Sequence, residues 1–166
     1  MHQVILPPRR ESIVGNILEG AHMPATPDEV LRQWFREVWD EGKEDAIDRL
    51  AAPDLRAYGL GAAGDPPIVG TAAFKELFHT FREALGDMQI AVDKTVVQGD
   101  HCAVLCHVKG RHVGSAFGGP PTHNPISFHG MVIARVVDGR IVEGWNCFDF
   151  LSMYQQIGWI KTPPTP

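Results

Sequence analysis

The spacing of the apolar residues changes from a helical to a strand period at Gly86. Before this glycine, apolar side chains recur at helical spacing in two stretches, residues 30–38 and 74–81. After it, the apolar residues follow extended segments, over residues 88–96, 102–109, 125–137 and 141–149. Helices followed by a run of sequential strands are typical of an α+β domain, because the helices then cover one face of the sheet.

The start of the domain is marked by a helix-capping signal. Thr26 is placed as an N-cap, Pro27 takes the first helical position, and Glu29 completes a capping box. We therefore expect one domain over residues 26–160, preceded by an arm at 1–25 and followed by a Pro-rich tail at 161–166.

Two turn signals order the strands of the second half. Gly99-Asp100 and Asp138-Gly139 each separate two extended segments, and Asp-Gly is a favoured hairpin turn. They predict an antiparallel meander, with the N-terminal helices packed on one face of a curved, twisted sheet. Such a sheet curls as it twists, and we expect it to enclose a pocket for a small ligand.

Charge and composition exclude several partners. The formal net charge is −5 and the sequence pI is 5.9, with no basic stripe, so neither nucleic acid nor an anionic membrane surface is expected as a partner. No apolar run reaches the length that spans a bilayer. The three cysteines contain no CxxC pair, which favours a cytoplasmic protein with reduced thiols.

Several motifs in the strand-rich half occur in a fixed order. They are GRHVG at residues 110–114, GPPT at 119–122, ISFHG at 126–130, GRIVEGWN at 139–146, Asp149, and QQIG at 155–158. Together with the helix that carries Trp34 and the Gly-Thr pair before residue 72, they resemble the SnoaL-like polyketide cyclases over roughly residues 27–159.

This resemblance implies the cone-shaped α+β barrel shared with ketosteroid isomerase and nuclear transport factor 2, in which a curved antiparallel sheet is packed on the N-terminal helices. It also implies an intramolecular aldol-type ring closure of an apolar carbonyl substrate without a cofactor. In the family an Asp in the last strand-to-helix stretch is the acid/base, which corresponds to Asp149, and a His of the same pocket corresponds to His112.

The chemistry of Asp149 is compatible with that role. Phe148 and Phe150 flank it, and burial among aromatic rings would raise the proton affinity of the carboxylate toward working pH. The competing interpretation is structural, because an Asp directly before a short helix is a good N-cap. His112 could donate to a substrate carbonyl or, alternatively, be a loop histidine that bonds backbone.

Four further residues are secondary candidates for the pocket: Asn146, His129, Trp145 and His107. Strand alternation places Asn146 on the opposite face from Asp149, whereas Trp145 shares the face of Asp149. The histidines of this region show no HxH, HxxxH or HExxH spacing, so no metal site is expected. A homodimer is expected, because an open sheet leaves one apolar face to cover.

Two other classes of function remain open. The same barrel could serve a dehydratase, an isomerase or an epoxide hydrolase, the last of which would require an arginine between two buried acids, with Arg111 and Arg135 as the nearby arginines. A non-catalytic ligand-binding or dimerisation module is the second alternative. It predicts a filled cavity or an Asp149 held by backbone donors.

Overall fold

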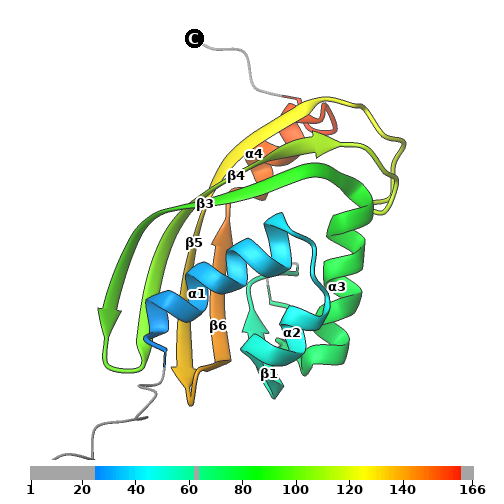
Figure 1. Ribbon diagram of the computed structural model, residues 1–166. Coiled ribbons are helices and arrows are strands. Elements are labelled where there is room, and N and C mark those ends of the chain that lie inside the picture. Colours follow the sequence, from blue (N-terminus) through cyan, green and yellow to red (C-terminus); the bar gives the residue numbers. More distant parts are fainter. Residues whose placement is uncertain (1–24, 62–63, 162–166) are drawn as a thin grey trace, which may run out of the picture.

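A computed structural model describes residues 25–61 and 64–161 of the chain (Figure 1). Its helical part consists of α1 (Pro27–Trp34), the π-helical turn η1 (Phe35–Asp40), α2 (Asp45–Leu50), α3 (Thr71–Ala84) and α4 (Phe150–Gln156). Its strands are β1 (Ala51–Tyr58), β2 (Ile68–Val69), β3 (Leu85–Gln98), β4 (His101–His112), β5 (Pro125–Val137) and β6 (Arg140–Phe148). Except for residues 25 and 161, the predicted arm and tail lie outside the described residues.

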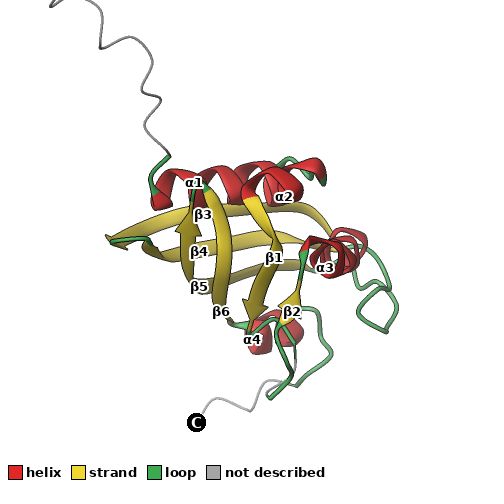
Figure 2. Ribbon diagram, turned by 90° about the horizontal axis from the view of Figure 1, so that it is seen from below, coloured by secondary structure: helices red, strands yellow, loops and turns green. Residues whose placement is uncertain are grey.

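The strands form one six-stranded sheet in the order β2-β1-β6-β5-β4-β3. From β3 to β6 the pairs are antiparallel, as expected, whereas β1 runs parallel to β6, so the sheet is mixed. The register of β3 against β4 shifts twice, at Gly86/Gln89 and at Val92/Lys94. Such irregularities bend a strand, and the long strands curl around the helices (Figures 1 and 2).

The first helix begins as its capping signal predicts. Thr26 donates its backbone N–H to Glu29 over 2.8 Å, and Pro27 opens α1. The helix then widens into the π-turn η1, which the apolar spacing did not predict. Helix α1 lies against the sheet (Figure 2), and Val30, Leu31 and Phe35 are buried, so α1 and η1 turn one apolar face to the sheet.

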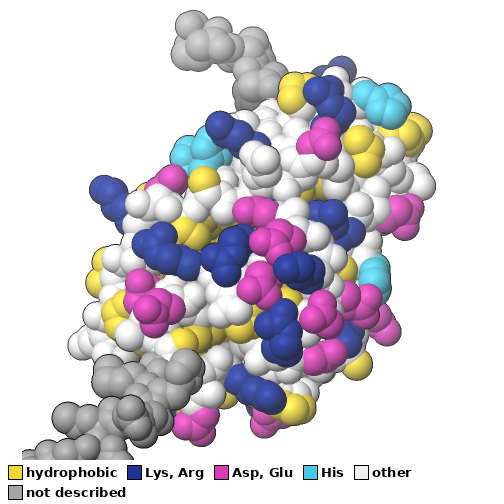
Figure 3. Space-filling model, in the orientation of Figure 1, with side chains coloured by type: hydrophobic (Ala, Val, Ile, Leu, Met, Phe, Trp, Pro, Cys, Tyr) yellow, Lys and Arg dark blue, Asp and Glu magenta, His cyan; other side chains and the backbone are white. Residues whose placement is uncertain are grey.

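The other face of the helices is charged. In Figure 3 lysine and arginine side chains are interleaved with aspartate and glutamate on this face. Arg49 bonds Glu37 over 2.7 Å and holds the pKa of that carboxyl at about 2. Lys75 pairs with Asp48 over 2.6 Å. None of the helices within the described ranges is long and apolar enough to span a bilayer.

The last helix is fixed to the sheet by the QQIG motif. Gln156 accepts the backbone N–H of Ser127 (2.7 Å) and donates to the Ser127 carbonyl (2.9 Å), so its amide extends the hydrogen bonding at the edge of β5. Met153 of α4 and Ile157 at the end of this helix are buried. This motif therefore has a structural role that places α4 at the end of β6.

Candidate functional site

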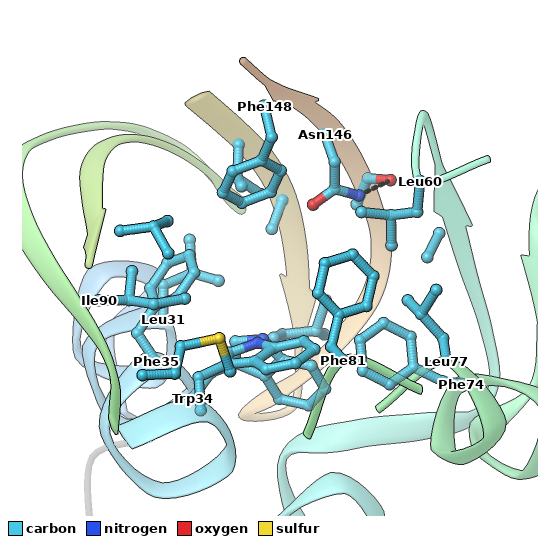
Figure 4. Close-up of a pocket in the computed structure, with 18 of the residues that line it drawn as sticks. Leu31, Trp34, Phe35, Leu60, Phe74, Leu77, Phe81, Ile90, Asn146 and Phe148 are labelled. Atoms are coloured by element: carbon cyan, nitrogen blue, oxygen red, sulfur yellow. Dashed lines mark hydrogen bonds between the residues drawn. The ribbon is translucent and has the colours of Figure 1, made fainter. Parts of the chain in front are cut away.

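An apolar cavity lies between the helices and the concave face of the sheet (Figure 4). The space inside it measures about 80 Å³, and with the open mouth included the hollow spans about 780 Å³. The lining side chains come from α1, η1, α3, the start of α4, the loop after β1 and all strands except β2. They include Leu31, Trp34, Phe35, Trp39, Phe74, Leu77, Phe81, Ile90, Phe128, Val132, Asn146, Phe148 and Phe150. A hollow lined in this way is suited to an apolar ligand.

The helical wall of the cavity is an aromatic cluster. Trp34 lies 5.2 Å from Phe74 between ring centroids, and Trp39 lies 6.1 Å from both Phe74 and Phe81. The π-turn adds one residue to the helical repeat and so changes which side chains of η1 point inward. Both tryptophans thereby reach the cavity from consecutive turns.

Strand alternation in β6 decides which candidate residues reach the cavity. Asn146 and Phe148 point inward and line it, whereas Trp145 and Cys147 are exposed on the outer face. Trp145 stacks on Tyr58 at 5.7 Å between ring centroids. Of the secondary candidates, Asn146 therefore lies in the pocket wall and Trp145 does not.

Asp149 caps α4. It accepts hydrogen bonds from the Ser152 backbone N–H (3.0 Å) and from the Ser152 hydroxyl (2.5 Å), and it is exposed. These two bonds, the hydroxyl first, lower the pKa of Asp149 below its ordinary value. The carboxylate is not among the groups that line the cavity. The structure thus shows the capping contact, and the acid/base role remains a prediction.

The Asp149 cap makes a pH-dependent contribution to stability. Since its folded pKa is lowered, this contribution is present above the unfolded pKa and is lost as the pH falls through the folded pKa. We expect Asp149→Ala to cost about 1 kcal/mol at neutral pH and less in acid, whereas Asp149→Asn keeps most of the cap. Denaturant unfolding of both variants, from neutral to acidic pH, measures the change in the free energy of unfolding. An equal loss for Asn and Ala at neutral pH would contradict the capping role.

His112 is fully buried at the end of β4 rather than in a loop. Its Nδ1 accepts the backbone N–H of Thr122 over 3.2 Å, so the neutral ring carries its proton on Nε2. No described residue hydrogen-bonds Nε2, but the ring meets Trp159 edge-on at 5.3 Å. His112 fixes the 113–124 connection and does not line the cavity, so its predicted assisting role remains untested.

His107 and His129 lie on the outer face of the sheet. Their rings stack at 4.5 Å between centroids across β4 and β5, and His107 Nε2 lies 2.7 Å from the Ser127 hydroxyl. Neither lines the cavity. Within residues 25–61 and 64–161, no group of three or more potential ligands is arranged to hold a metal ion.

The two arginines considered for epoxide opening are also outside the cavity. Arg111 donates to the His123 carbonyl over 2.7 Å. Arg135 pairs with Asp100 (2.9 Å) and Glu143 (3.6 Å), but all three side chains are partly exposed at the surface. Neither arginine forms the buried bridge between two acids that this alternative requires.

Comparison with known proteins agrees with this fold. A family model described as "SnoaL-like polyketide cyclase" matches residues 29–157. An aklanonic acid methyl ester cyclase, DauD, of Streptomyces sp. (strain C5) is 35% identical over 142 residues, covering 78% of this chain and 86% of the relative. Nogalonic acid methyl ester cyclase of Streptomyces nogalater is 28% identical over 126 residues, covering 73% and 90%.

Solved structures show the same architecture. IdmH of Streptomyces antibioticus superposes with a TM-score of 0.70 at 28% identity, covering 81% of this chain and 99% of that one. TsrD of Streptomyces laurentii gives a TM-score of 0.69 at 21% identity, covering 80% and 95%. The fold is thus the α+β sheet-and-helix cone of the cyclase class. The chain belongs to the SnoaL-like polyketide cyclase family.

Proposed function

We propose that the protein closes a ring in an apolar polycarbonyl substrate held in the cavity. The observation that carries this proposal is the enclosed aromatic and aliphatic wall with a single side-chain amide on it. Relatives of this chain are named as cyclases of aklanonic and nogalonic acid methyl esters, which are carbonyl-bearing esters of this kind. The substrate class is therefore a flexible polyketide ester.

The chemistry needs no redox partner. In an intramolecular aldol closure a base removes a proton next to one carbonyl, the resulting carbon bonds to a second carbonyl carbon, and the new alkoxide takes up a proton. The product has the mass of the substrate, so the reaction consumes no oxidant, reductant or transferred group, and the proposal is that it proceeds without a cofactor. An apolar cavity that fits the substrate favours ring closure, because it holds the two reacting carbons near each other. This removes much of the entropic cost of bringing them together.

Asp149 is the residue that the family resemblance implies as the acid/base. Its carboxylate would have to leave Ser152 to reach a bound substrate. Asp149→Asn tests the acid/base role, because asparagine can still cap α4 but cannot take up and release a proton at neutral pH. Loss of turnover with unchanged stability would support acid/base catalysis by Asp149. Unchanged turnover would assign the residue to the cap alone.

A direct assay tests the proposed reaction. The purified chain is incubated with aklanonic and nogalonic acid methyl esters, and the products are followed by chromatography and mass spectrometry. We expect a product of unchanged mass but altered retention and absorbance, formed in proportion to the enzyme. Formation at the rate of the protein-free reaction, with both esters bound, would contradict a cyclase.

A second function is favoured by one specific observation. Among the described residues no acidic, basic or histidine side chain lines the cavity. A chain that binds an apolar ligand without reacting would have this lining. The assay separates the two functions, because a binding protein retains the ester unchanged at the stoichiometry of the chain.

We also propose a homodimer that buries the outer face of the sheet. This face exposes large apolar side chains on neighbouring strands, among them Met131 at 53%, Ile133 at 46% and Trp145 at 39%. A second copy presents the same surface, as a two-fold dimer requires. Light scattering should give twice the chain mass for the wild type and the chain mass for Ile133→Lys. A monomeric wild type would contradict the dimer.

A further inference from the structure

Asn146 is the polar side chain in an otherwise apolar cavity wall. It pairs with Val132 across β5 and β6 and lines the cavity together with Gly144 two residues earlier. A β-carbon at Gly144 would find no atom nearer than Asn146 Nδ2 at 3.8 Å, so this glycine leaves open space beside the amide. A ligand can therefore reach the amide directly.

The orientation of the amide follows from its hydrogen bonds. Nδ2 donates to the Tyr58 carbonyl (2.8 Å) and to the Gly144 carbonyl (3.3 Å), so both amide protons are used. The reversed amide would place Oδ1 against two carbonyl oxygens, which repel it. Oδ1 therefore faces the cavity, as Figure 4 shows, and no described residue donates to it.

The backbone around Tyr58 is shaped to hold this arrangement. Gly59 has a φ of +76°, and a β-carbon at this position would collide with the Asn146 carbonyl oxygen. Only glycine allows the end of β1 to lie this close to β6. The amide is thus held from the backbone of β1 and of β6, and what remains for a ligand is a single acceptor.

We propose that Asn146 is the specificity-determining contact of the cavity: an oriented acceptor that selects substrates with a hydroxyl or enol O–H beside the apolar rings. This inference rests on the proposed function of the cavity as the substrate site. A ligand that places a carbonyl or ether oxygen here leaves two acceptors facing each other. A ligand with a hydroxyl satisfies both groups, which favours its binding by about 10- to 100-fold.

The test uses a matched pair of probes, 2-hydroxyanthraquinone and 2-methoxyanthraquinone, whose affinities are measured by calorimetry. The wild type is expected to bind the hydroxyl probe at least about tenfold more tightly. Asn146→Leu is expected to bind both probes alike. Ile90→Ala is the control: it lies across the cavity from Asn146 (Figure 4), so it should weaken both probes and keep their ratio.

The outcomes separate this inference from the proposed function. Equal affinity of the wild type for the two probes would overturn the role of Asn146 and leave the cavity as a ligand site. Binding of neither probe to the wild type would overturn both. The comparison on the wild type does not depend on any variant, so poor folding of Asn146→Leu cannot obscure it.

Discussion

Gly130→Ala is expected to weaken ligand binding at least tenfold and to destabilise the fold by about 1–3 kcal/mol. Gly130 lies on the inner face of β5, paired with Phe148 of β6. A β-carbon there would overlap the Phe148 ring, which stacks on Phe150 at 5.8 Å between centroids. The ring cannot turn outward through the sheet, so we expect it to move into the cavity.

Gly144→Ala is the matched control for stability, since it adds the same methyl group to the same inner face. Its β-carbon would meet nothing closer than 3.8 Å, so little change in stability is expected. Thermal unfolding of both variants measures the effect on stability, and the affinity of Gly130→Ala for 2-hydroxyanthraquinone measures the effect on the cavity. Wild-type affinity in Gly130→Ala would contradict the position assigned to Phe148 in the cavity wall.

Trp39→Ala is expected to cost about 3–5 kcal/mol of folding free energy. Trp39 is 9% exposed, and its ring lies within 6.1 Å of Phe74, Phe78 and Phe81 between centroids. Its removal deletes one layer of the wall between η1 and α3. It also opens the cavity on its helical side, so ligand affinity should fall as well.

Trp145→Ala is the comparison variant for both effects, because it removes a tryptophan from the outer face of the sheet. Trp145 is 39% exposed on the outer face, where Tyr58 is its stacking partner, so less area is lost from the core. Denaturant unfolding should give a clearly smaller loss than for Trp39→Ala, with ligand affinity retained. Similar losses for both tryptophans would contradict the burial of Trp39 in the core.

The order of elements was predictable because it depends on local sequence patterns. The capping box at Thr26, the helical spacing at residues 74–81 and the Asp138-Gly139 turn each specify a nearby structure, and the structure confirms them. The parallel pairing of β1 with β6 was not predictable. It joins segments more than eighty residues apart, and no local signal specifies a strand's distant neighbour.

Alternation of side chains along β6 predicted part of the candidate site, but not which face of the strand lines the cavity. Strand parity correctly placed Asn146 and Trp145 on opposite faces, but it does not say which face is inward. The sequence favoured the face of Asp149, because its aromatic neighbours suggested an apolar cup. In the structure those neighbours, Phe148 and Phe150, point into the cavity while Asp149 caps α4. The small residue Gly144, inward with Asn146, was the signal that could have identified this face.

The most direct test of the cavity as the substrate site is a crystal structure of the chain bound to 2-hydroxyanthraquinone. We expect the rings between the aromatic helical wall and the inner face of β5 and β6, with the hydroxyl oxygen within hydrogen-bond distance of Asn146 Oδ1. A ligand bound on the outer face of the sheet, with the cavity filled by its own side chains, would contradict the proposed site.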